Sequence, residues 1–224
     1  SEGLGNELLA EFLGTTVFLT GISRSASVLQ VVLCLLGAIL MSVKVSGAHL
    51  NPLVTCGKAV VENMAPVAVV GYICAQILGA ATASGLARVL SETDYNNPVD
   101  LNLDNDDPIK RKENEANYGH KFLGEMIGSM VFLSIVLASK SVADVSGIPV
   151  PIQVIVGLYT GATIASHWSG GQLNPAVTVM QMINNREGAG AGMVNIVGQF
   201  VGLGLGIGLL VLFGISSIGA KDTP

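Results

Sequence analysis

Two near-identical stretches interrupt the apolar pattern of this chain at matching places. Residues 46–52 read SGAHLNP and residues 169–175 read SGGQLNP, and apolar runs precede and follow both. Glycine and proline are poor residues for the interior of a helix. A chain that makes the same interruption twice is expected to build two equivalent broken segments, and this restricts its fold more than any other feature.

The residues around these stretches are typical of a membrane protein. Hydrophobic residues make up 50% of the 224, and only 12% are charged, whereas soluble domains have about a quarter charged residues. An apolar stretch of about 18 or more residues can cross a bilayer as a helix. Six such segments can be drawn, at 5–23, 26–45, 65–88, 119–139, 150–168 and 190–215. The sequence therefore predicts a multi-pass, all-α membrane protein.

The acidic excess of the chain is local. The net charge is −5, and half of the 16 acidic residues lie between Glu92 and Glu115. Residues 91–118 also contain Asn-Pro and Asp-Pro turn signals, so they are interpreted as a long loop outside the membrane. The basic patch at 110–112 is balanced by acids and does not indicate a nucleic-acid site. The three cysteines give neither a disulfide framework nor metal-ligand spacing, and no cofactor is expected.

This loop separates two halves that match each other. EFLGTTVFL at 11–19 parallels EMIGSMVFL at 125–133, and Asn51 is as far from Gln76 as Asn174 is from Gln199. We interpret residues 1–90 as a first repeat, 91–118 as a connecting loop and 119–224 as a second repeat. Because each repeat has an odd number of spans, the second is inverted in the membrane, and inverted repeats bring their broken helices together near the midplane.

Each Asn-Pro pair is expected to start a short helix. Asparagine is a favoured N-cap and proline fits the first helical position, so helices should begin after Asn51 and Asn174. Non-helical backbone at membrane depth is tolerated where it lines a wet cavity. The pore-lining backbone is therefore predicted at Gly47, Ala48, His49, Gly170, Gly171 and Gln172. Two helix N-termini at the midplane would oppose cations, while the asparagine amides could donate hydrogen bonds to neutral solutes.

Glu11 and Glu125 occupy equivalent positions in the two repeats. We interpret them as structural anchors for the backbone of the Asn-Pro segments. No other charged residue within the spans is placed to relay protons or bind ions. A proton-coupled or ion-coupled transporter is therefore disfavoured, and passive passage of neutral molecules is favoured.

The motifs AEFLGT, SGAHLNP, GEMIGS and SGGQLNPA, with Gln76 and Gln199, are together similar to those of the aquaporin (major intrinsic protein) family. The resemblance covers essentially the whole chain. It implies six transmembrane helices plus two re-entrant half-helices in an inverted internal repeat, a homotetramer with one pore per subunit, and no enzymatic activity. It also implies a protein of the lipid bilayer, at the plasma membrane by default and at an internal membrane as the alternative. The pore motifs would be Asn51, Pro52, Leu53 and Asn174, Pro175, Ala176.

The resemblance further implies an unusual selectivity filter. The family typically has arginine directly after the second motif, where this chain has Val177, and counting from the two motifs places the other filter positions at Val31, Ala162 and Gly171. This small, uncharged set predicts a wide filter that passes water and small neutral solutes such as glycerol, urea or ammonia. Thr178 stands where glycerol facilitators of the family typically have aspartate, so this chain also differs from the usual pattern of a glycerol facilitator.

Leu53 is the second departure, because the family usually has alanine there. Local repacking around Leu53 is favoured over altered gating. One alternative function stays open at this point, namely a poorly conducting family member with a structural or adhesion role, for which Leu53 and the acidic loop would be the sequence features.

Overall fold

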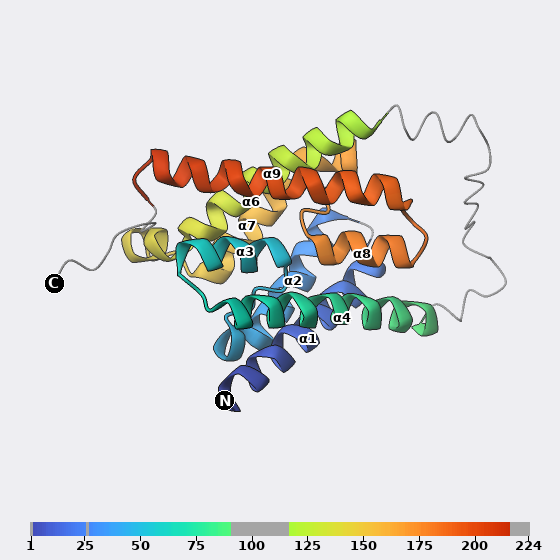
Figure 1. The fold of residues 1–224 in the computed structure, drawn as a ribbon, viewed down its shortest axis with the longest axis horizontal. Coiled ribbons are helices and arrows are strands. Elements are labelled where there is room, and N and C mark those ends of the chain that lie inside the picture. Colours follow the sequence, from blue (N-terminus) through green and yellow to red (C-terminus); the bar gives the residue numbers. More distant parts are fainter. Residues whose placement is uncertain (1, 26, 91–116, 216–224) are drawn as a thin grey trace.

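The computed structural model describes residues 2–25, 27–90 and 117–215, and it is helical in each of these ranges (Figure 1). Within these ranges, six helices are long: α1 (Glu2–Ser23), α2 (Val28–Ser46), α4 (Pro66–Leu90), α6 (Tyr118–Ser146), α7 (Val150–Ser169) and α9 (Ala189–Leu212). Two are short: α3 (Pro52–Val61) and α8 (Pro175–Ile183). Nearly all of the predicted acidic loop, residues 91–116, lies outside the described residues.

The six predicted spans correspond to the six long helices. By length and composition, α2, α4, α6 and α9 are able to cross a membrane. Helices α1 and α7 have 22 and 20 residues but carry more polar side chains, among them Glu11 and Gln153. Both of these side chains are buried, so the rest of the protein shields these two polar groups from the surroundings.

The long helices pack in two equivalent sets. Helix α1 packs against α2 and α4, α6 packs against α7 and α9, and α2 contacts α7 between the sets. Figure 1 shows α3 and α8 in one row between α4 and α9, and each short helix contacts both of these long ones. Large apolar side chains such as Leu40, Val67 and Leu212 face outward and are mostly exposed, as expected where the surrounding solvent is lipid.

Glycines allow the helices of each set to approach closely, as is usual in membrane proteins. A Cβ atom on Gly161 of α7 would lie 2.5 Å from the carbonyl oxygen of Gly128 of α6. A Cβ atom on Gly79 of α4 would lie 2.9 Å from the carbonyl oxygen of Phe12 of α1. The α1–α4 approach brings Glu11 and Gln76 within hydrogen-bonding distance, and this contact belongs to the site described next.

Candidate functional site

The two half-helices begin in the same way. The side-chain oxygen of Asn51 accepts a hydrogen bond from the Leu53 amide at 2.9 Å, and that of Asn174 accepts one from the Ala176 amide at 2.9 Å. Proline follows each asparagine at the start of the helix. This is the capping geometry that the residue types favour.

The two caps are also bonded to each other's loops. The amide nitrogen of Asn51 donates to the carbonyl of Leu173 at 2.9 Å, and that of Asn174 donates to the carbonyl of Leu50 at 3.0 Å. The N-termini of α3 and α8 therefore face each other at the centre of the protein. A side-chain amide nitrogen can donate two hydrogen bonds, and each makes one to the described part of the chain, so a second N–H remains for a ligand.

The loops that lead into the half-helices follow the same backbone path. Left-handed φ values recur at three equivalent positions in each loop: Gly47 (+82°), Ala48 (+51°) and Leu50 (+50°), and Gly170 (+87°), Gly171 (+63°) and Leu173 (+50°). Alanine and leucine rarely adopt this conformation, and it persists only where the surroundings enforce it. At Gly171 a side chain is excluded as well, because a Cβ atom would lie 2.6 Å from the carbonyl oxygen of Ala162.

Glu11 holds the first loop. One carboxylate oxygen accepts hydrogen bonds from the Ser46 hydroxyl at 2.6 Å and the His49 amide at 2.9 Å. The other accepts from the Leu50 amide at 2.7 Å and the Gln76 side chain at 2.8 Å. Glu11 is completely buried, and two of its four contacts satisfy backbone amides, those of His49 and Leu50, that have no helix or strand partner.

Glu125 holds the second loop through the equivalent contacts. Its oxygens accept from the Ser169 hydroxyl at 2.6 Å and the Gln172 amide at 2.9 Å, and from the Leu173 amide at 2.8 Å and the Gln199 side chain at 2.6 Å. Four donors of the same kinds thus converge on each glutamate. The glutamines that mark equal spacings in the sequence are part of both networks.

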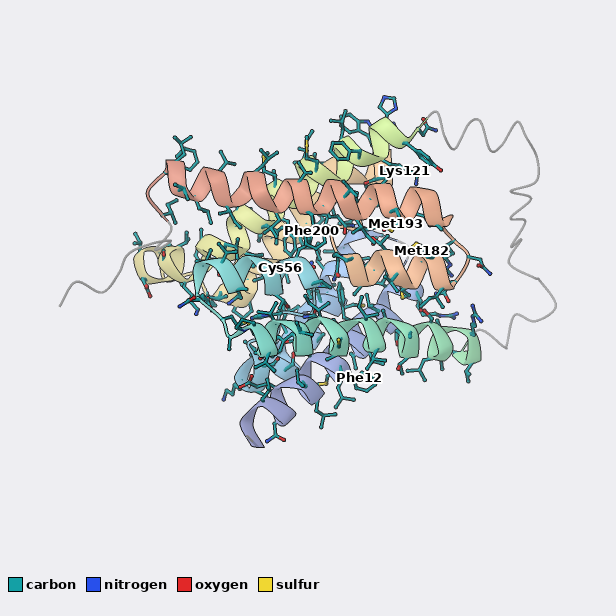
Figure 2. All side chains as sticks on the ribbon, viewed as in Figure 1. Phe12, Cys56, Lys121, Met182, Met193 and Phe200 are labelled. Carbon is teal, nitrogen blue, oxygen red and sulfur yellow. The ribbon has the colours of Figure 1, made fainter. Side chains whose placement is uncertain are left out.

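In the loop before α8, the side chain of Gln172 is also held in place, by Glu187. Glu187 accepts a hydrogen bond from the Gln172 side chain at 2.6 Å and from the Asn195 side chain at 3.0 Å. Lys121 forms an ion pair with it at 2.9 Å, and Figure 2 shows Lys121 at the end of the molecule where α8 carries Met182. The loop before α8 is therefore fixed through both its backbone and a side chain.

A cavity of about 130 Å³ lies between the two loops and the two half-helices. It has room for several water molecules. The predicted residues that line it are Val31, Gly47, Ala48, His49, Asn51, Gly170, Gly171, Gln172, Asn174 and Val177. The other predicted residues are buried in the protein but are not among the described lining residues: Glu11, Pro52, Leu53, Glu125, Ala162, Pro175 and Ala176.

Ala162 is the predicted filter residue whose position differs most from the expectation. It is 4% exposed and lies behind Gly171, against its backbone. Leu158, one turn earlier on α7, lines the cavity instead. The assignment of Ala162 to a filter stays a prediction.

The structure adds residues that the sequence interpretation did not identify. Each half-helix presents one face to the cavity, formed by the asparagine cap and the residues three and seven positions after it. On α3 this face is Asn51, Val54 and Lys58, and on α8 it is Asn174, Val177 and Gln181. Positions i, i+3 and i+7 share one side of a helix, so this spacing could have identified Lys58 and Gln181 from the sequence.

Leu53 is fully buried in the apolar core, which leads to the first prediction. We expect Leu53→Ala to lower the free energy of unfolding by about 2–5 kcal/mol, because a buried leucine is truncated and leaves a void. We expect water permeability per molecule to stay at the level of the unchanged protein, because Leu53 does not line the cavity. Unfolding in detergent and stopped-flow light scattering measure the two quantities. A several-fold change in permeability would instead assign Leu53 a role in gating.

Three comparisons with known proteins agree with this geometry. A family model described as major intrinsic protein matches residues 2–159. Glycerol uptake facilitator protein-like 6 of Lactiplantibacillus plantarum is 29% identical over 195 residues, which are 76% of this chain and 80% of that protein. Probable aquaporin PIP2-6 of Arabidopsis thaliana is 32% identical over 168 residues, covering 70% of this chain and 55% of the plant protein. The match thus spans only about half of the plant relative.

Among solved structures, the aquaglyceroporin from Plasmodium falciparum matches 97% of this chain and 98% of its own with a TM-score of 0.67. At 19% sequence identity, this likeness shows the fold. The predicted fold class, six membrane-spanning helices with two half-helices in an inverted repeat, is confirmed.

Proposed function

Because this chain belongs to the major intrinsic protein family, and is therefore a multi-pass membrane channel of the aquaporin and glycerol facilitator type rather than an enzyme, we propose that the cavity between α3 and α8 is its pore. The pore passes water and small neutral solutes, with glycerol, urea and ammonia as the expected ones. The observation that carries this proposal is Val177, an uncharged side chain on the cavity wall at the position where the family typically has arginine.

The chemistry of the cavity wall supports this solute class. The two loops and the amides of Asn51 and Asn174 place polar groups on the wall, while Phe18, Phe132 and Leu158 contribute apolar surface. A solute with hydrogen-bonding groups on one edge and carbon on the other, such as glycerol, can satisfy both surfaces. Specific sites of this kind combine a mostly apolar lining with a few placed polar groups.

We propose that Val31, Gly171 and Val177 form the wall of a wide filter, with Ala162 directly behind Gly171. Val31, Gly171 and Val177 line the cavity and carry neither a charge nor a side-chain hydrogen-bond donor. A filter whose side chains lack these groups discriminates solutes mainly by size. One matching relative is named a glycerol uptake facilitator and one matching structure an aquaglyceroporin, and both names support permeation by solutes larger than water.

We further propose that the pore motifs are Asn51-Pro52-Leu53 and Asn174-Pro175-Ala176 and that Glu11 and Glu125 are their anchors. The pairwise matching of the contacts of the two glutamates supports a division into repeats at 1–90 and 119–224. A homotetramer with one pore per subunit, in the plasma membrane, completes the proposal and follows from the family resemblance.

The proposal is tested by stopped-flow light scattering on proteoliposomes that contain the purified full chain. We expect water, glycerol and urea to cross faster than in protein-free liposomes of the same lipid. Passage of water alone would contradict the wide filter and leave a water channel.

The second candidate function is a structural or adhesion role for a poorly conducting member of the family. It is supported by Leu53, which replaces the usual alanine of the first motif and is fully buried. The same experiment separates the two, because a structural protein would pass neither water nor solutes above the protein-free level.

A further inference from the structure

Lys58 brings a positive charge to the wall of the cavity from α3. Lys58 is the only lysine, arginine, aspartate or glutamate among the described residues that line the cavity. Its side chain is 17% exposed. We propose that Lys58 is a charge-selectivity residue of this channel and excludes cations at the α3 end of the pore. This inference rests on the proposed function, since it requires the cavity to be the conducting path.

The charge of Lys58 is held in place by an ion-pair cluster. Glu62 accepts one contact from Lys58 at 3.2 Å and one from Lys140 of α6 at 2.8 Å, both at the same carboxylate oxygen. Partial burial raises the pKa of the Glu62 carboxyl, but its contacts with Lys140 and Lys58 outweigh burial and hold the pKa below its ordinary value. Two lysines and one ionised glutamate leave the cluster with a net positive charge at neutral pH.

The cluster lies at the mouth of the cavity rather than at its centre. The Lys140 side chain is 68% exposed and that of Glu62 is 37% exposed, whereas Asn51, at the other end of the same face of α3, is buried. A cation that enters from this side would meet Lys58 before it reaches the half-helix N-termini. A neutral solute has no net charge for Lys58 to repel, so the residue discriminates by charge.

Among the described lining residues, none brings such a charge to the opposite end of the pore. Gln181 occupies on α8 the place that Lys58 occupies on α3, and Val177 corresponds to Val54. The central barrier from the two helix N-termini is equivalent to about half a positive charge each. Because Val177 contributes nothing to this barrier, Lys58 supplies the one full charge that the described wall adds to it.

A structural role for Lys58 would make a different prediction. Lys58 lies in the last turn of α3, where a cation interacts favourably with the helix dipole. At the end of α8 the same role falls to Arg88 of α4, which donates to the carbonyl of Ile183 at 2.8 Å. Arg88 does not line the cavity. It is therefore a matched control, because removing it takes a cation from a half-helix end without changing the pore wall.

The test compares Lys58→Gln, Lys58→Arg and Arg88→Gln with the unchanged full chain in proteoliposomes. Potassium entry is followed with an internal potassium-sensitive dye, and water permeability is measured in the same vesicles. For Lys58→Gln we expect potassium entry to rise about tenfold, which corresponds to about 1.4 kcal/mol in the barrier. Lys58→Arg keeps the charge and should keep the low potassium entry, and Arg88→Gln should do the same.

Water permeability of each variant reports whether it is folded and open. If Lys58→Gln conducts water and excludes potassium as well as the unchanged chain does, the inference is wrong and the proposed function stands. An equal rise in Arg88→Gln would also overturn it, since the effect would then come from a weakened half-helix. If the unchanged chain passes no water, the proposed function fails and this inference fails with it.

Discussion

Replacing Glu125 by alanine is expected to abolish water permeability and to lower the free energy of unfolding by about 3 kcal/mol or more. The substitution leaves the Gln172 and Leu173 amides, the Ser169 hydroxyl and the Gln199 side chain without their acceptor. These donors lie inside the protein at membrane depth, where no bulk water replaces the lost contacts. The loop before α8 would then lose the path that places Asn174 on the cavity wall.

The effect of Glu125→Ala is measured by denaturant unfolding in detergent and by stopped-flow water permeability. Glu11→Ala should behave in the same way, because its carboxylate has the equivalent four contacts. Asp144→Ala is the control on the same helix as Glu125. Asp144 is exposed, and surface substitutions of this kind usually change stability by less than about 0.5 kcal/mol. Wild-type stability and permeability in Glu125→Ala would show that the loop does not depend on this carboxylate.

The second large effect is expected for Val177→Arg. Val177 is 5% exposed and lines the cavity, so a longer, charged side chain must occupy part of the solute path. We expect glycerol and urea flux per molecule to fall at least about tenfold, the change produced by about 1.4 kcal/mol in the barrier. Water flux should fall less, since water is smaller and can accept hydrogen bonds from the guanidinium group.

Val177→Met is the matched control for Val177→Arg, because it adds length without charge or hydrogen-bond donors. A moderate loss of glycerol flux in the methionine variant and a larger loss in the arginine variant would separate volume from charge. Unchanged glycerol flux in Val177→Arg would place the narrowest part of the path elsewhere. A protein that conducts neither water nor glycerol would show no change in flux with either substitution.

Much of the fold could be predicted because its signals are local. Apolar length sets the six spans, and asparagine followed by proline sets the start of α3 and α8. The repeated spacing from Asn51 to Gln76 and from Asn174 to Gln199 also has a physical basis in the structure. Each glutamine lies beside a glutamate that holds the preceding loop, so equal spacing in the sequence corresponds to equivalent contacts.

The filter was harder to predict, because counting along the chain does not fix the rotation of a helix. Ala162 and Leu158 are one turn apart on α7, and the close approach of Gly161 to Gly128 sets which of them faces the cavity. Lys58 was missed for a different reason. The sequence interpretation assigned Lys58 no role, although it belongs to the i, i+3, i+7 face that begins at Asn51. Its pairing with Lys140 through Glu62 joins residues far apart in the sequence.

The central claim, a pore wide enough for small neutral solutes, is tested most directly by the reflection coefficient for glycerol. Proteoliposomes containing the unchanged chain are mixed with equal osmolalities of sucrose or glycerol, and the initial rate of shrinkage is recorded for each. We predict slower initial shrinkage in glycerol than in sucrose, followed by rapid reswelling, because glycerol crosses the same pore as water. Equal initial shrinkage in both solutions, with no reswelling above the protein-free rate, would contradict the claim.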